Sequence, residues 1–342
     1  MRPSDVSALL APMIRERYPV LLVGPPGVGK SDLVAQAAEV AKADLIVSHP
    51  VVDDPTAAKG YPWLQAKRDH ADHVPYGELY KALNAKKPTV WFLDDLGQAL
   101  PAVQASYMQL LLTRSSNGRK LPAVVTFVAA TNRRTDRAGV TGILEPVKSR
   151  FVTIVHLETN LDDWCQWAIR TGQQPELIAF LRFRPELLHK FTATLDLVNS
   201  PSPRTWASVG KILRLKLSPR IELAAIQGAV GEGAAAEVVA FLRIFRELPT
   251  LDGILLDPDS AKIPDSAAAL YAVATGLASK VTASNFARIA RYADRLYRDN
   301  KGEFAVLMVR DAIRHKPEVQ NTPAFIQLAS TSVGKLFAGE GG

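Results

Sequence analysis

The stretch VLLVGPPGVGKSDLV, residues 20–34, decides the fold of this chain. It begins with a short, fully apolar run of the kind found in buried parallel strands, and it ends in a segment with the pattern of a helix. Between them, Gly24, Gly29, Lys30 and Ser31 have the spacing of a phosphate-binding loop. Because strand, loop and helix follow in the required order, the sequence predicts a domain that binds nucleotide phosphates.

The chemistry of this loop explains its composition. Glycines let the backbone turn its N–H groups inward, and the helix that starts beside Lys30 directs its positive dipole end at the same point. We expect Lys30 to contact the β and γ phosphates of ATP, and the Ser31 hydroxyl to help hold Mg²⁺. The predicted nucleotide-binding residues are Gly24, Pro25, Pro26, Gly27, Val28, Gly29, Lys30, Ser31 and Asp94.

A second stretch, VWFLDDLGQA at residues 90–99, places two adjacent carboxylates at the end of an apolar strand predicted over residues 89–95. In phosphate-loop enzymes such a strand carries an acidic residue beside Mg²⁺. Successive strand residues point to opposite sides, so we assign Asp94 to Mg²⁺, as a ligand with Ser31, and Asp95 to polarising the attacking water. The alternative interpretation is a pair of solvated aspartates that open a turn.

The order of predicted elements indicates the fold class. Further apolar strands are expected at residues 44–49, 123–131 and 151–157, with helical patterns between them. This alternation is typical of a parallel sheet with helices on both faces, and the strand signals stop near residue 158. We predict an α/β P-loop core domain at 1–158, an all-α lid domain at 159–248 and a helical C-terminal region at 249–342.

Two later motifs make the chain similar to the AAA+ ATPases. FVAATN, residues 127–132, resembles the strand of that superfamily that ends in a polar amide. The resemblance implies that Asn132 orients water against the γ phosphate. SPRTWASVGKIL, residues 202–213, resembles the sensor 2 element of the lid domain. It implies that ATP binds between the two domains, with Arg204 at the start of a lid helix near the nucleotide.

A third motif implies that the site is shared between subunits. GILEPVKSRF, residues 142–151, is similar to the segment that carries an arginine finger in AAA+ proteins. By this resemblance Arg150 would project into the site of a neighbouring subunit. Lys148, two residues earlier, competes for the same role. Such a finger is worth about 10³ to 10⁵ in turnover, so isolated protomers are expected to be nearly inactive.

Residues 50–83 make the chain similar to the MoxR-type branch of the superfamily. That resemblance implies a ring, expected to be a hexamer, that uses ATP hydrolysis to remodel a protein partner in a chaperone-like role. The partner would often contain a von Willebrand factor A domain. The same resemblance places Tyr61 and Trp63 near the ring axis, where they would grip a substrate or pack on their own domain. Asp95 departs from the family, in which most members carry Glu at this position.

Composition and charge leave two alternative functions open. The chain has 342 residues, a net charge of +7 and a single cysteine, Cys165, which excludes an internal disulfide and favours a reducing, cytoplasmic location. No run of about 18 apolar residues occurs, so no membrane segment is expected. Residues 1–150 carry 19 Lys or Arg against 14 Asp or Glu. This basic excess favours, as the first alternative, a nucleic-acid motor or loader. Asp95 favours the second, an ATP-binding switch or scaffold with little turnover.

Two smaller clusters have a functional and a neutral interpretation each. Basic residues gather between residues 114 and 137, where they would either face a polyanion or form an ordinary solvated surface. They are Arg114, Arg119, Lys120, Arg133, Arg134 and Arg137, and an Asn-Gly pair at 117–118 predicts a hairpin among them. His70, Asp72 and His73 have a loose metal-like spacing, for which we expect no metal because no further histidine or cysteine follows nearby.

Overall fold

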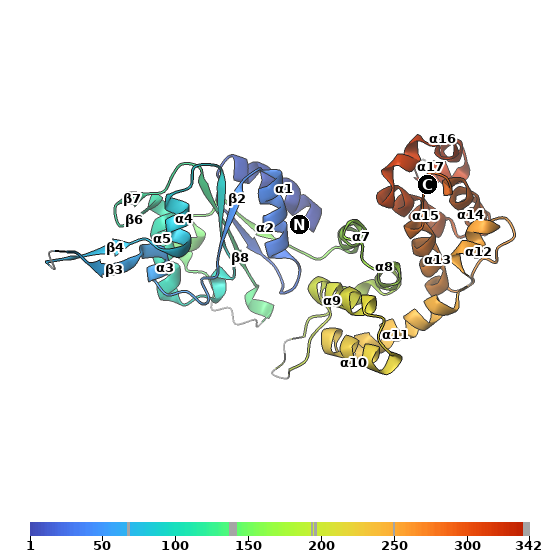
Figure 1. Cartoon of the computed structure of the whole chain (residues 1–342), viewed down its shortest axis with the longest axis horizontal. Coiled ribbons are helices and arrows are strands. Elements are labelled where there is room, and N and C mark those ends of the chain that lie inside the picture. The colour runs from blue at the N-terminus through green and yellow to red at the C-terminus, as the bar shows by residue number, and fades with distance from the viewer. Residues whose placement is uncertain (67–68, 137–141, 193, 195–196, 249, 338–342) are drawn as a thin grey trace. The chain divides into compact units, whose positions relative to one another are not determined.

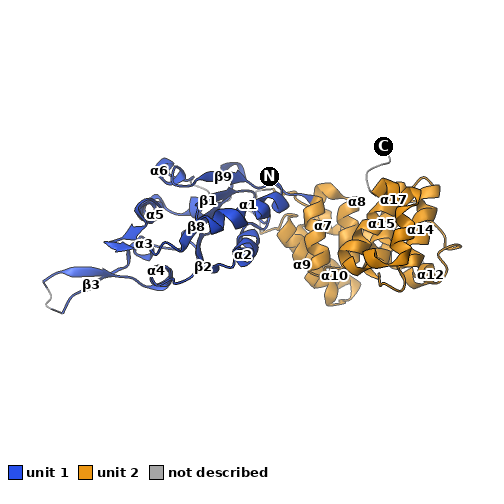
Figure 2. Ribbon diagram, turned by 90° about the horizontal axis from the view of Figure 1, so that it is seen from above, with its two compact units in different colours: residues 1–160 blue, residues 161–342 orange. Residues whose placement is uncertain are grey.

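The chain divides into two compact units, residues 1–160 and 161–342 (Figure 2). The computed structural model describes residues 1–66, 69–136, 142–192, 194, 197–248 and 250–337. The predicted α/β domain followed by helices is confirmed, because strands of the main sheet belong to unit 1 and unit 2 is built from helices. Residue 249, where we placed the boundary between lid and C-terminal region, lies outside the described residues, so that division stays a prediction.

A five-stranded sheet forms the centre of unit 1, with its strands in the order β2-β5-β8-β1-β9 (Figure 1). Every neighbouring pair in this sheet is parallel. The apolar runs form its interior strands because both faces are covered, and every residue of β5 and β8 is buried. The strands are β1 (Val20–Val23), β2 (Asp44–Ser48), β5 (Thr89–Leu93), β8 (Val125–Thr131) and β9 (Thr153–His156).

Helices cover both faces of this sheet, and strand alternation divides the core between them. Leu22, Val90 and Phe92 pack with α1 and α2 on one face, whereas Leu21 and Trp91 pack with α4 and α5 on the other (Figure 1). The helices of unit 1 are α1 (Pro3–Arg15), α2 (Lys30–Val40), α3 (Thr56–Lys59), α4 (Gly77–Leu83), α5 (Pro101–Thr113) and α6 (Glu145–Lys148), with 3₁₀ helices η1 (Leu96–Gln98) and η2 (Arg134–Asp136).

Two hairpins extend from unit 1. The first pairs β3 (Tyr61–Leu64) with β4 (Ala71–Val74), and all described side chains on its strands are exposed. The second pairs β6 (Ser115–Ser116) with β7 (Arg119–Lys120). Its turn is the Asn-Gly pair, whose φ angles of 46° and 79° place both residues in the left-handed region. The hairpin predicted from this pair is therefore confirmed.

Unit 2 is helical, and α13 packs against both α8 and α15. Two hydrophobic clusters form its core, and Leu248 and Tyr271 pack against both of them. Its elements are α7 (Leu161–Arg170), α8 (Pro175–Phe183), η3 (Pro185–Leu187), α9 (Pro203–Arg214), α10 (Pro219–Val230), α11 (Glu232–Glu247), α12 (Leu251–Leu256), α13 (Ala267–Ser279), α14 (Phe286–Arg298), α15 (Gly302–His315), η4 (Pro317–Asn321), α16 (Pro323–Ala329) and α17 (Ser332–Phe337).

A buried ion pair joins the two parts of unit 2 that the sequence assigned to separate regions. The Arg182 guanidinium on α8 binds both carboxylate oxygens of Asp311 on α15, with Nη2 at 2.9 Å from Oδ1. It also donates to the Thr275 hydroxyl of α13 at 3.1 Å. The two charged side chains are only 5% and 0% exposed.

None of the helices within the described ranges is both long and apolar enough to cross a bilayer.

Candidate nucleotide-binding site

The glycine-rich loop follows β1 directly and is fixed at its first residue. The Gly24 N–H donates to the Thr131 carbonyl at the end of β8, at 3.2 Å. A Cβ on Gly24 would approach the Leu157 carbonyl oxygen to 3.0 Å, so the close packing of neighbouring chain segments requires glycine there. Gly29 has a φ of 92°, which turns the chain into the start of α2. The loop therefore has the strand and helix context that the sequence predicts.

Lys30 connects the loop with the predicted sensor residue. Its ammonium group donates to the carbonyl oxygens of Gly24 and Pro25 at 2.9 and 3.0 Å, and to Asn132 Oδ1 at 2.7 Å. The side chain is buried, with 7% of the residue exposed. Burying a cation is costly unless oxygen atoms surround it, and these three acceptors meet that requirement. The structure thus brings together Lys30 and Asn132, which lie 102 residues apart in the sequence.

Ser31 and Asp94 form the second contact across the site. The Ser31 hydroxyl donates to Asp94 Oδ2 at 2.7 Å, and it does so from the first turn of α2. The Asp94 N–H donates to the Ser48 carbonyl at 2.9 Å, which holds the end of β5 beside β2. A hydroxyl and a carboxylate are oxygen ligands of the kind that Mg²⁺ prefers. Ser31 and Asp94, the two side chains predicted to hold the metal, therefore fit Mg²⁺ chemically.

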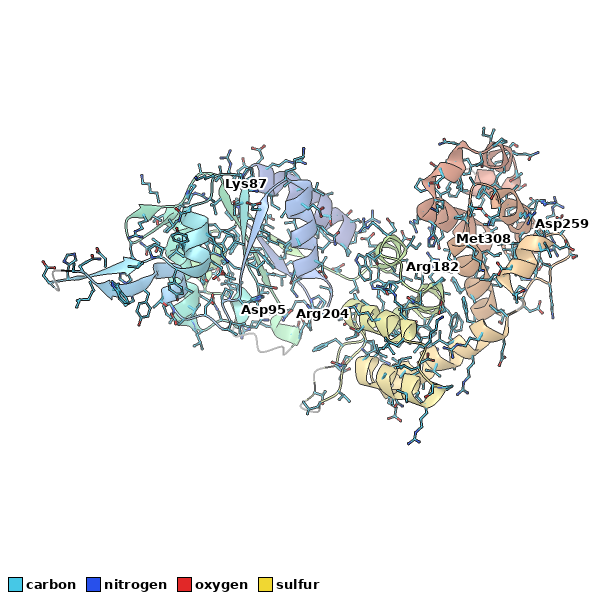
Figure 3. The ribbon with its side chains drawn as sticks, viewed as in Figure 1. Lys87, Asp95, Arg182, Arg204, Asp259 and Met308 are labelled. Atoms are coloured by element: carbon cyan, nitrogen blue, oxygen red, sulfur yellow. The ribbon has the colours of Figure 1, made fainter. Side chains whose placement is uncertain are left out.

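The predicted strand over residues 89–95 is too long, because β5 ends at Leu93. Asp95 lies in a turn with a φ of 55°, in the left-handed region, and its N–H donates to Asp94 Oδ1 at 3.1 Å. Asp and Asn tolerate this conformation better than most residues. The two aspartates thus point differently because of the turn after the strand and not because of strand alternation. Figure 3 labels Asp95 at the edge of the sheet where β5 ends.

Two further hydrogen bonds lie near the carboxyl ends of β2 and β5. The Trp91 indole N–H donates to the Ser48 hydroxyl at 2.8 Å, and the Tyr107 hydroxyl of α5 donates to Asp53 Oδ2 at 2.7 Å. Burial raises the pKa of Asp53, and the hydrogen bond from Tyr107 opposes this effect. Burial and the neighbouring Asp53 likewise raise the pKa of Tyr107. The first bond joins β5 to β2, and the second joins α5 to the segment that follows β2.

The structure distinguishes the two candidate fingers by their partners. Lys148 forms an ion pair with Glu145 of the same helix, α6. Arg150 follows that helix, and within the described part of the chain no group accepts a hydrogen bond from its buried Nε atom. Of the two, Lys148 is therefore the cation whose charge a neighbouring carboxylate already neutralises, and within the described residues Arg150 has no such ion pair.

Arg204 belongs to unit 2, whereas the other predicted site residues belong to unit 1. It is the second residue of α9 and is exposed. Ser202 caps this helix, accepting from the Thr205 N–H at 3.2 Å while the Thr205 hydroxyl accepts from the Ser202 N–H at 2.8 Å. This capping box and Pro203 fix where the helix starts and thus where Arg204 projects from unit 2.

Two of the basic residues between 114 and 137 have internal partners. Arg114 donates to the carbonyls of Pro122 and Val125, and Arg133 binds the Asp136 carboxylate. Arg119, Lys120 and Arg134 are exposed, and Arg137 lies outside the described residues. Within the described ranges no cluster of three or more His, Cys, Asp or Glu has the arrangement of a metal site, and His70 and Asp72 are exposed.

Sequence reasoning missed two residues beside the carboxylates. The Gln98 side chain donates to Asp95 Oδ1 at 2.7 Å and lies 3.5 Å from the Thr131 hydroxyl. Thr131 also provides the carbonyl that accepts from Gly24. Gln98 follows Asp95 by three residues in the stretch DDLGQ, but only the turn at η1 reveals that the two side chains meet.

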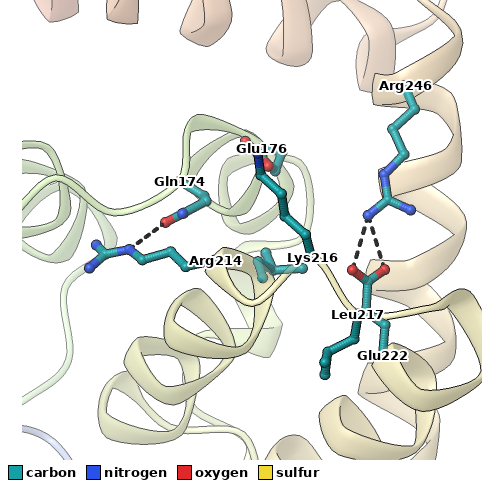
Figure 4. Close-up of a pocket in the computed structure, with 8 residues that line it drawn as sticks. Gln174, Glu176, Arg214, Lys216, Leu217, Glu222 and Arg246 are labelled. Carbon is teal, nitrogen blue, oxygen red and sulfur yellow. Dashed lines mark hydrogen bonds and ion pairs between the residues drawn. The ribbon is translucent and has the colours of Figure 1, made fainter.

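A polar pocket of about 520 Å³ lies in unit 2 (Figure 4). One pair of charged groups in it is an ion pair, with Arg246 Nη2 at 3.0 and 3.1 Å from the two carboxylate oxygens of Glu222, and Arg214 donates to the neutral Gln174 at 3.3 Å. Burial raises the pKa of Glu176 beside them. The lining residues are Gln174, Glu176, Leu213, Arg214, Lys216, Leu217, Glu222 and Arg246. Mixed charges of this kind select no ligand class, so the candidate site remains at the phosphate loop.

Comparison with known families agrees with this geometry. Residues 19–151 match the family model of the AAA domain, dynein-related subfamily. The match spans the phosphate loop, both aspartates, Asn132 and Arg150. The first unit therefore contains an AAA+ ATPase domain. A comparison with curated protein sequences finds no match.

Solved structures with a related fold include two bacterial proteins. The RuvB Holliday junction branch migration motor of Thermotoga maritima is 16% identical with a TM-score of 0.37, and the match covers 80% of each chain. NtrX from Brucella abortus in complex with ATP is 10% identical with a TM-score of 0.43, and the match covers 99% of this chain and 68% of that one. Neither likeness bears on substrate or partner.

Proposed function

We propose that this chain, through its AAA domain at residues 19–151, binds ATP and hydrolyses it to ADP and phosphate. The observation that carries the proposal is the pair of contacts from Lys30 to Asn132 and from Ser31 to Asp94. These contacts gather four residues from three separate strand ends around the phosphate loop. Each is a residue type that phosphate transfer to water requires: a cation, a polar amide, a hydroxyl and a carboxylate.

In the proposed reaction the oxygen of a water molecule bonds to the γ phosphorus while the bond to the β–γ bridging oxygen breaks. The products are ADP and inorganic phosphate, and Asp95 accepts the proton that the water releases. Lys30 offsets the negative charge of the β and γ oxygens. Asn132 holds Lys30 with its Oδ1, so its NH₂ group is the part that would orient the water. Mg²⁺, when bound to Ser31 and Asp94, would supply further positive charge.

We further propose that the site is completed by a neighbouring copy in a ring, with six subunits expected. Arg150 is the candidate finger, since Lys148 already neutralises Glu145 in an ion pair. Within the described residues no carboxylate pairs with Arg150, so its charge is available to the site of a neighbouring subunit. Arg204 would contact the nucleotide from unit 2 of the same chain.

The proposed use of ATP turnover is remodelling of a protein partner, in the manner of MoxR-type proteins. Support comes from the β3–β4 hairpin, which presents Tyr61 and Trp63 on one face with 56% and 63% of each residue exposed. Large aromatic side chains at such exposure contribute contact area to a partner and little to their own domain. The neutral interpretation, in which these aromatics pack on their own domain, has less support at this exposure.

The test is ATPase activity measured against protein concentration for the wild type, Lys30→Ala, Arg150→Ala and Lys148→Ala. We expect cooperative dependence on concentration, loss of ATP binding in Lys30→Ala, and retained binding with turnover reduced about 10³-fold or more in Arg150→Ala. Lys148→Ala should retain turnover. Full activity in Arg150→Ala would contradict the assignment of the finger. ATP binding without turnover in the wild type would instead favour the nucleotide switch.

A nucleic-acid motor remains the second candidate because of the basic excess in residues 1–150. The Asp136 carboxylate neutralises one of these cations, Arg133. An ATPase rate that rises with DNA or RNA, and loses this stimulation steeply as salt increases, would support the motor. We expect no stimulation at low salt.

A further inference from the structure

Gln98 is the side chain that contacts the carboxylate of Asp95. Its amide Nε2 donates to Asp95 Oδ1 at 2.7 Å, and its backbone N–H donates to the Asp95 carbonyl at 3.0 Å. Both side chains are half-buried at the end of β5. A hydrogen bond to an ionised carboxylate is about twice as strong as one between neutral groups. The contact therefore restricts a side chain that otherwise rotates about two bonds.

The local backbone produces this contact. Asp95 precedes the 3₁₀ helix η1, and Gln98 is its last residue. Asp95 is the N-cap of this helix, and the single turn that follows brings the Gln98 side chain back beside it. Gly97 keeps the turn close to β8, because a Cβ at that position would lie 2.1 Å from the Thr131 hydroxyl oxygen. The Gln98 amide is thus fixed between the Asp95 carboxylate and Thr131.

We propose that Gln98 is a positioning residue that holds the Asp95 carboxylate in the orientation that accepts the proton of the attacking water. This inference rests on the proposed ATP hydrolysis and on the role of Asp95 in it. One carboxylate oxygen, Oδ1, is occupied by the Gln98 amide, and the other, Oδ2, is the oxygen left to face the water.

The arrangement also connects Asp95 to the sensor strand. The Gln98 Oε1 atom lies 3.5 Å from the hydroxyl of Thr131, which precedes Asn132 and accepts from the first residue of the phosphate loop. A displacement of β8 that moves Asn132 would therefore also move the amide that holds Asp95. The geometry thus places the Gln98 amide between the Asp95 carboxylate and the strand that precedes Asn132.

The first experiment compares Gln98→Ala and Gln98→Glu with the wild type in steady-state ATP hydrolysis. We expect kcat to fall about 10- to 100-fold in both, with KM and the dissociation constant of a fluorescent ADP analogue unchanged within about twofold. Gln98→Glu has the same shape but cannot donate to Asp95, so an effect through packing alone would leave it active. Gln109→Ala, an exposed glutamine of α5, is the matched control and should keep wild-type turnover.

The second experiment is a double-mutant cycle between Gln98→Ala and Asp95→Asn. If Gln98 acts through Asp95, its replacement should change kcat less than about threefold once Asp95 is already Asn. Multiplication of the two separate losses would overturn the inference, as would wild-type turnover in Gln98→Glu. Full turnover in Asp95→Asn would instead refute the proposed role of Asp95, and absence of turnover in the wild type would refute the proposed hydrolysis. The failures are therefore distinguishable.

Discussion

Unit 1 and unit 2 each bury a cation, and they surround it with different acceptors. Lys30 in unit 1 donates to two carbonyls and one side-chain amide oxygen, which are neutral groups. Arg182 in unit 2 binds the carboxylate of Asp311, which is an anion. The two carbonyls and the amide oxygen orient the ammonium towards the phosphate loop. The carboxylate cancels the charge of the guanidinium, so that pair is expected to hold helices together.

The comparison teaches that burial of charge by itself does not mark a functional site. Arg182 and Asp311 are at least as buried as Lys30, and they adjoin Cys165, whose pKa is raised to about 11 by burial. A thiol with a raised pKa is a poor nucleophile. Cys165 is thus a small buried side chain of the core. The type of acceptor, more than the degree of burial, separates the two cations.

The largest effect is expected from breaking the buried pair. Arg182→Ala should lower the free energy of unfolding of unit 2 by about 3 to 5 kcal/mol, because it leaves Asp311 buried without its cation. Urea denaturation followed by tryptophan fluorescence measures this loss. The double variant Arg182→Met with Asp311→Leu should recover most of it, since packed apolar side chains replace both charges. A double variant as unstable as the single one would show that the pair contributes more than charge balance.

Lys30→Ala addresses the other cation and should affect binding more than stability. Loss of its charge-assisted contacts to phosphate is expected to weaken ATP binding about 100-fold, or about 2.7 kcal/mol. The free energy of unfolding should change by less than about 1 kcal/mol, because removal of the ammonium also removes the cost of burying it. Calorimetric titration with ATP and urea denaturation measure the two quantities. A large loss of stability with unchanged affinity would place Lys30 with Arg182 as a structural cation.

Gly97→Ala tests how closely the carboxylate turn packs on the sensor strand. The added Cβ would lie 2.1 Å from the Thr131 hydroxyl oxygen, so we expect a loss of about 2 kcal/mol in the free energy of unfolding, along with reduced turnover. Gly228→Ala is the matched control in α10, where an added Cβ meets nothing within 4 Å. It should stabilise the chain by about 0.5 to 1 kcal/mol. Equal effects of the two substitutions would contradict the close approach.

The smallest effect concerns an ion pair at the border of the buried network in unit 2. Burial alone would raise the pKa of Asp162, but hydrogen bonds from Arg314 and Gln166 outweigh it and lower the pKa to about 2. The folded pKa is below the unfolded value near 3.9, so the pair stabilises the fold above about pH 4 and loses this contribution as the pH falls towards 2. Its side chain is 41% exposed, and solvent screening reduces the contribution to about 1 kcal/mol.

Asp162→Asn should therefore lower the free energy of unfolding by about 1 kcal/mol at pH 7, and the difference from the wild type should shrink between about pH 4 and pH 2. Urea denaturation at each pH measures it. Asp265→Asn, at an exposed position, is the control and should show no such trend. A difference that grows as the pH falls would reverse the sign of the predicted linkage.

Local patterns predicted much of unit 1 because strand periodicity and the phosphate loop are set by neighbouring residues. The loop, the parallel strands and the Asn-Gly hairpin follow from such patterns. The end of β5 does not, because the prediction continued the strand through both aspartates, whereas the strand ends at Leu93 and Asp95 adopts a left-handed φ of 55°. The bond between Gln98 and Asp95 depends on that turn and was not predicted.

Unit 2 illustrates the limits of the sequence further. Nothing in the local sequence pairs Arg182 with Asp311, which lie 129 residues apart. Long-range pairs of this kind follow from packing of whole helices, and single-sequence periodicity carries no information on partners so distant.

The exposed hairpin gives the protein a built-in optical reporter. Trp63 is 63% exposed on β3, whereas Trp91 and Trp206 are fully buried, Trp164 is 6% exposed and Trp167 is half-buried. A dissolved quencher such as iodide must collide with an indole to extinguish its emission, so it should act mainly on Trp63. Protection of this emission on addition of a candidate partner would show directly, and without any label, that the partner covers the hairpin.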